Sequence, residues 1–383
     1  MEMRKDYPHI NWTDGMKLNK DLFIAQDNAH TATMHNLISS TLSPVRYGLL
    51  PDEDNFNVEI AVDNQNTARV SIISCKAITK GGVYISIAPS PSSEQGESVL
   101  SFSLTLPSTT SDTWWVALTV QPYERIPYGT IDPTENPPRH PYVKPVYNVQ
   151  LVSDHEFHQY AYNPYALIIG KLIPTGSGLR NDEEYIPPCI STNALQDLIQ
   201  LHAELDVFLS NLEQACSQIV QKIYRKSQQN ELSELAQFCC DRLSLYLGKA
   251  ITDFRWFYLY ESPVKMISDI VGLARVLKNT IDLRIGSGKE ELMNYLSEWS
   301  ELKQGELEAL LTQMASMKYN HNDINQNIIN IIQFAKVIGR LFTTLSNLEF
   351  IGKKKEAGIF VKEGYISEPE SNTAPKPRRR FFG

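Results

Sequence analysis

Apolar residues recur along the middle of the chain at alternating steps of three and four. One seam, with steps of 4, 3, 4, 3, 4, 3 and 4, consists of Leu198, His202, Leu205, Leu209, Leu212, Cys216, Ile219 and Ile223. A second seam, with steps of 4, 3, 4, 3, 4 and 3, consists of Ile324, Ile328, Ile331, Ala335, Ile338, Phe342 and Leu345. A period of about 3.5 residues keeps one narrow edge of a helix against a partner helix over a long distance. The seams therefore predict helices that pack along their length, within the subunit, between subunits or both.

The region that contains both seams predicts an all-α domain. Apolar periodicity and capping residues place its helices at 192–226, 231–260, 263–284, 290–318 and 322–349. Pro187 and Pro188 end the preceding strand region, so we expect a domain boundary there, with domains at 1–188 and 189–350.

The chain before this boundary changes to a period of two. Short β-branched or aromatic runs separated by turn residues predict strands at 57–62, 68–75, 82–88, 99–106, 114–120, 146–152 and 166–173. A helix at 21–42 precedes them and ends before Pro44. Strands of this length favour an antiparallel β-sandwich. The predicted fold class is therefore α+β, with a β-sandwich followed by a helical-bundle neck and a short basic tail.

A proline-rich stretch interrupts the strand pattern. Residues 121–145 contain seven prolines, with four tyrosines in or near the stretch. Because proline removes ladder donors, the stretch is expected to be a surface loop and not a strand. It is either a contact surface or a packed crossover.

Residues 351–383 form a tail of different composition, which we expect to be disordered. Eight basic and four acidic residues give it a net charge of +4, against −12 for the rest of a chain whose total is −8. It is either a solvated end or a segment that docks on an acidic partner or an anionic membrane surface. The candidate contact residues are Lys353, Lys354, Lys355, Arg378, Arg379, Arg380, Phe381 and Phe382.

Charge and cysteine content exclude several functions. The acidic balance argues against nucleic-acid binding, which needs a basic surface. Five cysteines without a CxxC pair favour a reducing compartment over a disulfide framework or zinc site. With neither an N-terminal leader pattern nor a run of about 18 apolar residues, we expect a cytoplasmic protein.

No catalytic constellation emerges from the sequence. The run Gly286 to Lys289 resembles a phosphate loop, but Glu290 stands where serine or threonine belongs. His155 and His158 lack a third ligand, so no metal site is expected. We expect no cofactor, no small-molecule substrate and no enzyme. An enzyme with a sandwich substrate domain and a helical catalytic domain is the alternative from another class.

Three short segments carry a further signal, and the first lies at residues 10–26, with Trp12, Asp14, Gly15, Met16, Leu18, Phe23 and Gln26 as its distinctive positions. These segments resemble the TssK family, the trimeric baseplate subunit of type VI secretion systems. Lys20 and Leu22 replace the family's usual proline and histidine. The other two segments are 47–49 and 182–189, the latter at the junction of sandwich and helices.

The resemblance implies a fold and partners. Members of the family have a β-sandwich shoulder similar to phage receptor-binding proteins, a helical neck, and a C-terminal head that contacts the membrane complex. It implies a cytoplasmic, non-catalytic homotrimer that links wedge proteins similar to TssF and TssG to that complex at the inner membrane. About 34 residues after the last neck helix are too few for an ordinary head, which indicates a divergent, Bacteroidetes-like branch. A phage-like tail receptor-binding or baseplate adaptor protein is the alternative.

Site residues follow from the same resemblance. The seven matching positions of the first segment are candidates for the wedge contact, the two seams for the trimer neck, and the tail for the membrane-complex contact. We expect Trp12 and Phe23 to be buried rather than in direct contact with a partner.

Overall fold

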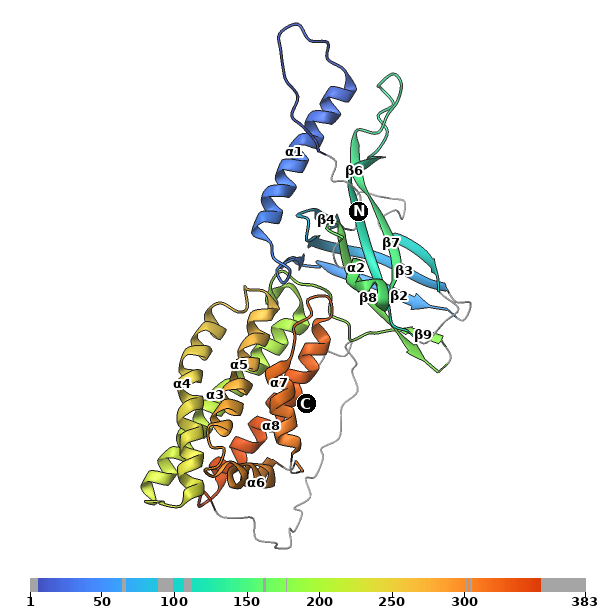
Figure 1. The fold of residues 1–383 in the computed structure, drawn as a ribbon. Helices are drawn as coiled ribbons and strands as arrows, with labels where there is room; N and C mark the ends of the chain where they lie inside the picture. Colours follow the sequence, from blue (N-terminus) through green and yellow to red (C-terminus); the bar gives the residue numbers. More distant parts are fainter. Residues whose placement is uncertain are drawn as a thin grey trace, which may run out of the picture. The chain divides into compact units, whose positions relative to one another are not determined.

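The computed structural model describes residues 6–63, 67–88, 99–106, 112–160, 163–176, 178–300, 302–303 and 305–352. The chain divides into two compact units. The first contains residues 1–194 together with His321–Asn325, and the second contains Leu195–Asn320 and the chain from Gln326 onward. Figure 1 shows the strands of the first unit and the helices of the second.

The first sheet of the first unit is built around the long strand β3 (Thr67–Ile78). It pairs in antiparallel fashion with β1 (Gly48–Leu49), β2 (Phe56–Val62), β4 (Tyr84–Ile87) and β5 (Leu100–Thr105). Alternate residues of β3, among them Ala68, Val70 and Ile72, are fully buried. The period of two in the sequence thus reports one face turned into a core.

The second sheet has the order β7-β6-β8-β9 and is also antiparallel. Its strands are β6 (Trp114–Tyr128), β7 (Tyr142–Ser153), β8 (Ala166–Thr175) and β9 (Gly178–Asn181). Gly170 of β8 lies against Ile60 of β2, where a side chain at position 170 would overlap the isoleucine. The two sheets therefore pack face to face, and the predicted α+β fold with an antiparallel sandwich is confirmed.

The prediction of a loop across 121–145 is wrong for residues 121–128 and 142–145, which lie in strands, whereas residues 129–141 between them do form a loop. Strands β6 and β7 continue as a paired ribbon to Tyr128 and Tyr142, with a register shift between Gln121 and Arg125. Beyond Thr119 the strand β6 pairs only with β7, so the outer edges of the ribbon carry no ladder. A proline whose missing N–H faces such an edge removes no hydrogen bond.

Two helices belong to the sandwich unit. Helix α1 (Lys20–Thr41) starts at Asn19, whose side chain accepts a hydrogen bond from the backbone N–H of Leu22, close to the predicted 21–42. Helix α2 (Asp154–Tyr160) was not predicted; its Phe157 stacks on Trp115 with ring centroids 4.2 Å apart. Helix α1 buries only Ala29.

The second unit is helical. Its elements are α3 (Gln196–Arg225), α4 (Glu231–Trp256), α5 (Pro263–Asp282), α6 (Lys289–Ser300), α7 (Glu306–Ser316) and α8 (Ile324–Asn347), of which Ile324 and Asn325 are assigned to the first unit. The single helix predicted at 290–318 is two helices. Gly305 adopts a left-handed φ of 89° before α7, and the backbone N–H of Lys303 donates to the carboxylate of Glu306. The left-handed glycine and the hydrogen bond to Glu306 together define the start of a new helix.

Both predicted seams are covered by the chain itself. All residues of the two seams are buried in a single chain except His202, whose ring is half-buried, stacks on Phe254 and bonds its carbonyl oxygen at 2.9 Å. The heptad pattern therefore reports packing within the chain, and a role of the seam residues in contacts between copies stays a prediction.

Helix α8 bears on the expectation that the chain has no apolar run long enough to span a membrane. It is the one helix of the described chain that is long and apolar enough to cross a membrane. The buried core helix of a soluble protein passes the same test. Ile328, Ile331 and Ile338 of this helix are fully buried.

Candidate interaction site

An exposed apolar surface lies at the start of the chain. We call it the N-terminal surface, and it consists of Trp12, Leu18, Phe23, Ile24, Met34 and Leu37. Trp12 is 46% exposed and Phe23 is 58% exposed, so the expectation that these two residues are buried is wrong. Large apolar side chains gathered in this way usually mark an interaction site.

The segment that resembles the TssK motif folds back on helix α1. Gly15 has a φ of 78°, a left-handed conformation suited to glycine, and the N–H of Met16 donates to the carbonyl of Thr13 in the same turn. The amide oxygen of Gln26 accepts a hydrogen bond from the N–H of Ile10 at 3.3 Å. The motif glycine and glutamine thus shape the segment.

Most apolar positions of the motif are exposed. The rings of Trp12 and Phe23 lie 6.3 Å apart, Leu18 is exposed beside the start of α1, and Asp14 is also exposed. Met16 is half-buried. Five of the predicted wedge residues are therefore positioned as a surface rather than a core, and their contact with a partner stays a prediction.

Helix α1 is held to the sandwich along another side. Arg125 of β6 binds the carboxylate of Asp27 at 2.5 Å and the side-chain oxygen of Asn28 at 2.7 Å. Gly82 lies so close to the helix that a Cβ there would stand 2.5 Å from the carbonyl oxygen of His35. These contacts fix the helix, which leaves Phe23, Ile24 and Leu37 uncovered.

The structure joins the other two segments that carry the resemblance. The N–H of Leu49 donates to the carbonyl of Pro188 at 2.8 Å, and the N–H of Ile190 donates to the carbonyl of Leu49 at 3.0 Å. Gly48 has a φ of 112°, and a side chain there would overlap the backbone of Pro188. The matching positions of these segments therefore serve internal packing.

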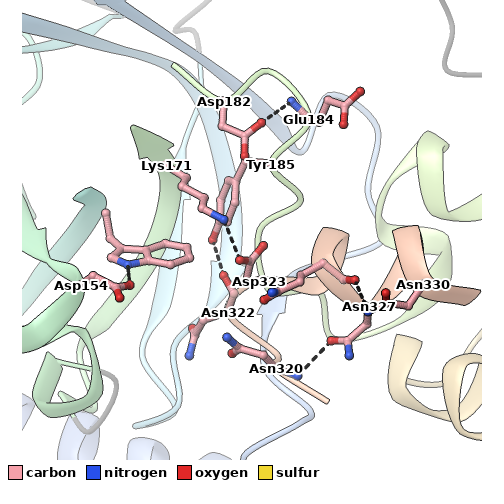
Figure 2. Close-up of polar contacts among 12 residues, drawn as sticks. Asp154, Lys171, Asp182, Glu184, Tyr185, Asn320, Asn322, Asp323, Asn327 and Asn330 are labelled. Atoms are coloured by element: carbon pink, nitrogen blue, oxygen red, sulfur yellow. Dashed lines mark hydrogen bonds and ion pairs between the residues drawn. The ribbon is translucent and has the colours of Figure 1, made fainter. Parts of the chain in front are cut away.

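The same region receives a segment from far along the chain. We call it the buried clasp, and it is His321–Asn325 with its partners in the sandwich unit. The hydroxyl of Tyr185 donates to the carbonyl of Asn322 at 2.9 Å, and Lys171 pairs with Asp323 at 2.8 Å (Figure 2). His321 bonds the carbonyl oxygen of Tyr47 at 2.9 Å.

Burial keeps the titratable groups of the clasp uncharged apart from its ion pair. Burial lowers the pKa of His321 to about 4, although the Tyr47 carbonyl acts in the opposite direction. Burial raises the pKa of Tyr47 to about 12 and raises the pKa of Tyr185 well above its ordinary value. The ammonium of Lys171 also lies 4.9 Å from the ring centre of Trp115. The clasp is built for structure, because its groups do not exchange protons near neutral pH.

The sequence analysis marked parts of the clasp without identifying it. Tyr47 and Tyr185 lie in two segments that carry the resemblance, but nothing in the sequence pointed to residues 321–323 as their partners. Those residues are polar and lie at the start of the helix predicted at 322–349.

The structure also places the residues considered for chemistry. Cys75 and Cys239 are buried, and burial raises the pKa of each thiol to about 12. Lys289 binds Asp282 at 2.8 Å and Glu308 at 2.9 Å, so it belongs to a helix–helix turn. Over the described residues no group of three or more histidine, cysteine or acidic side chains is arranged to hold a metal ion. The tail candidates from Lys353 onward lie outside the described residues.

The fold defines a class: an α+β protein with an antiparallel β-sandwich followed by a helical bundle. No family model and no curated protein matches the chain. Solved structures that resemble it are of TssK proteins and of type VI secretion baseplates. One described as "Crystal structure of TssK" is 15% identical, with a TM-score of 0.48 over 89% of this chain and 70% of that chain.

Two further structures have similar scores. "The baseplate complex from the type VI secretion system" is 16% identical, with a TM-score of 0.47 over 89% of this chain and 100% of that chain. "Structure of TssK from T6SS EAEC in complex with nanobody nb18" is 15% identical, with a TM-score of 0.44 over 83% of this chain and 99% of that chain. Likeness of this degree leaves the function to be argued from the residues.

Proposed function

We propose that the protein is a non-catalytic structural adaptor of a type VI secretion baseplate. It acts as a homotrimer in the cytoplasm, binds wedge proteins similar to TssF and TssG, and connects them to the membrane complex at the inner membrane. A solved structure described as a TssK-TssF-TssG baseplate subcomplex names these wedge proteins, which are therefore the partners to test.

The observation that carries the proposal is the exposure of the N-terminal motif. Its tryptophan, leucine and phenylalanine are not used to fill the core of this chain: Trp12, Leu18 and Phe23 are 46%, 58% and 58% exposed. Aromatic side chains at interface centres dominate binding energies. An exposed aromatic motif on a helix that buries one residue is what a docking face requires.

Co-purification tests the wedge contact. The tagged full-length protein is co-expressed with TssF- and TssG-like proteins, and Trp12→Ala and Phe23→Ala are compared with the wild type. Each substitution is expected to weaken binding by about 10-fold, because hot-spot truncations cost more than ~1 kcal/mol. The melting temperature should hardly change, since both side chains are about half exposed in the free chain.

Leu245→Ala in helix α4 is the matched control, because Leu245 is 75% exposed and lies in the other unit. Equal recovery of the wedge proteins with wild type, Trp12→Ala and Phe23→Ala would remove the N-terminal surface as the wedge contact. The tail is tested separately: a chain ending at Ile351 should lose the membrane complex and keep the wedge proteins.

A further inference from the structure

The turn between helices α5 and α6 presents two exposed aliphatic side chains at one end of the helical unit. Leu283 is 70% exposed and Ile285 is 69% exposed. Among the large apolar side chains that the structure describes, only Leu245 is more exposed. Removal of aliphatic side chains of this size from water is favourable. The turn is therefore suited to an apolar environment, and we call Leu283 and Ile285 the aliphatic tip.

Hydrogen bonds within the turn hold the aliphatic tip in place. The N–H of Ile285 donates to the carbonyl oxygen of Asp282 at 3.1 Å. The N–H groups of Ser287 and Lys289 both donate to the carbonyl oxygen of Arg284, at 2.9 Å and 3.1 Å. Backbone N–H groups that are bonded inside the turn need no water, so the tip can enter an apolar layer at low cost.

The basic tail begins at the same end of the helical unit. The N–H of Gly352 donates to the hydroxyl oxygen of Tyr295 in α6 at 2.9 Å, and a Cβ at Gly352 would stand 3.0 Å from the Cβ of Leu232 in α4. Gly288 of the turn also lies against α4, where a Cβ would stand 2.8 Å from the side chain of Leu235. The turn and the start of the tail therefore both lie beside the first turns of α4 (Figure 1).

The charge that would attract an anionic surface resides in the tail and not in the turn. Arg284 stands between the two residues of the tip, and its guanidinium lies 4.3 Å from the ring centre of Phe238. Lys289 pairs with acidic side chains, and Glu290 and Glu291 are near it in the sequence. The turn therefore has no net positive charge, whereas the tail has eight basic and four acidic residues.

The residue types distinguish a lipid partner from a protein partner. Hot spots of protein interfaces are enriched in tryptophan, tyrosine and arginine, and leucine is under-represented among them. The tip is aliphatic, and the tail combines its basic residues with Phe381 and Phe382 near its end. A bilayer surface takes up apolar side chains at the acyl boundary and attracts lysine and arginine through anionic headgroups. The composition of this end of the unit therefore favours a bilayer.

We propose that this end of the helical unit binds the surface of an anionic lipid bilayer. Leu283 and Ile285 enter the boundary between headgroups and acyl chains, and the basic tail binds the headgroups. One weak membrane signal gives only marginal, reversible binding, and two signals together give a stable attachment. The turn and the tail supply one signal each. The contact goes beyond the proposed function and depends neither on a trimer nor on the wedge proteins.

Co-sedimentation of the full-length protein with vesicles tests the inference. Binding is expected to vesicles that contain phosphatidylglycerol and not to vesicles of phosphatidylcholine alone. The double variant Leu283→Ser, Ile285→Ser should bind the anionic vesicles at least about 10-fold more weakly, because both aliphatic side chains are lost. The chain that ends at Ile351 should bind them at least about 100-fold more weakly, because each basic residue near an anionic surface adds to the attraction.

Leu245→Ser, at an exposed position of α4, is the matched control and should bind the vesicles like the wild type. Circular dichroism melting confirms that the variants are folded.

A fluorescent label reports which part of the chain meets the lipid. The five native cysteines are buried, so a cysteine introduced at an exposed position can be labelled selectively with an environment-sensitive dye. The emission of a dye on Ile285→Cys should shift to the blue when anionic vesicles are added, because the dye enters an apolar layer. A dye on Leu245→Cys should keep its emission.

Three results would overturn the inference. If the wild type does not bind anionic vesicles, this end of the unit is not a lipid contact. If the double serine variant binds them as tightly as the wild type, the aliphatic tip takes no part. If the vesicles are not bound but the double variant and the shortened chain lose the detergent-solubilised membrane complex, the contact is with a protein. Failure of the wild type to recover the wedge proteins would instead contradict the proposed function and leave the lipid contact unaffected.

Discussion

The buried histidine of the clasp makes stability of the sandwich unit depend on pH. His321 is 4% exposed, and its ring meets the ring of Tyr47 at 4.7 Å between centres. Because the carbonyl oxygen of Tyr47 only accepts, Nε2 of His321 must carry the hydrogen in the bond between them. A neutral imidazole with Nε2 protonated meets this need without burying a charge.

The sign and size of the effect follow from the pKa of His321. Burial lowers it from 6.5 to about 4. As the pH falls, the unfolded chain therefore takes up a proton before the folded chain does. The contribution of this group to the free energy of unfolding is fully present above pH 6.5 and is lost as the pH falls through 4. The loss amounts to ~2 kcal/mol at pH 5 and ~3 kcal/mol at the acid limit.

His321→Gln removes the titration and keeps a side-chain N–H donor. Stability of the sandwich unit is read from hydrogen exchange of peptides from β3 and β6 in a urea series, because the two units need not unfold together. Between pH 7.5 and 5 the wild type should lose ~2 kcal/mol more than the variant. Replacing the exposed His155 by glutamine should leave the wild-type profile unchanged.

A general loss of stability in His321→Gln would shift the whole profile without changing its slope. The comparison therefore depends on the difference between the two slopes and not on the absolute stability of the variant. Parallel profiles from pH 7.5 to 5 would refute the reasoning, because they would mean that His321 takes up its proton equally well in the folded chain.

Four further single substitutions and one double variant probe the packing. Asp323→Asn should destabilise the sandwich unit by about 3 kcal/mol in urea unfolding because it leaves Lys171 buried without its partner, and Lys171→Met combined with Asp323→Leu should recover most of that loss. Gly82→Ala should speed hydrogen exchange of the α1 amides by at least about 10-fold, because its Cβ would overlap the backbone of α1. Gly15→Ala, where the surrounding space is open, should lower the free energy of unfolding by only about 1 kcal/mol. Phe254→Ala, which removes a fully buried ring, should lower the stability of the helical unit by about 3–5 kcal/mol in urea unfolding.

Local patterns predicted the regular elements well. Alternation found seven of the strands, and the first-turn proline placed the start of α5 correctly. Strand β1 was missed because two residues are too few to show a period, and β9 was missed because its sequence Gly-Leu-Arg-Asn contains no β-branched or aromatic residue. The ribbon of β6 and β7 was not predicted because proline is excluded only from strands that are hydrogen-bonded to a neighbour on both sides. Each strand of this ribbon is paired on one side only.

Spacing within the seams could not reveal which chain covers them. A repeat with alternating steps of four and three residues indicates that one edge of a helix is buried. It does not indicate whether the helix that covers this edge belongs to the same chain or to another copy. Leu205 and Leu212 are covered by neighbouring helices of the same subunit. The opposite face of α3, with Ala203 and Val207, has the same spacing and remains exposed. Charge content separates the two faces of this helix where periodicity does not.

The clasp could not be predicted because its contacts join distant parts of the chain. Tyr47 and His321 are 274 residues apart, and Lys171 and Asp323 are 152 residues apart. Nothing in the polar run before α8 encodes a return to the sandwich. The only indication of the clasp in the sequence was that Tyr47 and Tyr185 lie within the segments that resemble the family.

The three resembling segments differ in what explains them, and this difference bears on function. Gly48 and Pro188 are required by a close backbone approach, and Tyr185 by a buried hydrogen bond. Any protein with this fold would need such residues whatever it binds. Trp12 and Phe23 have no comparable internal requirement, because each leaves about half of its surface in solvent. Exposed aromatic residues that lie close to each other are typical of interaction sites, so the N-terminal surface is where a partner should be sought first.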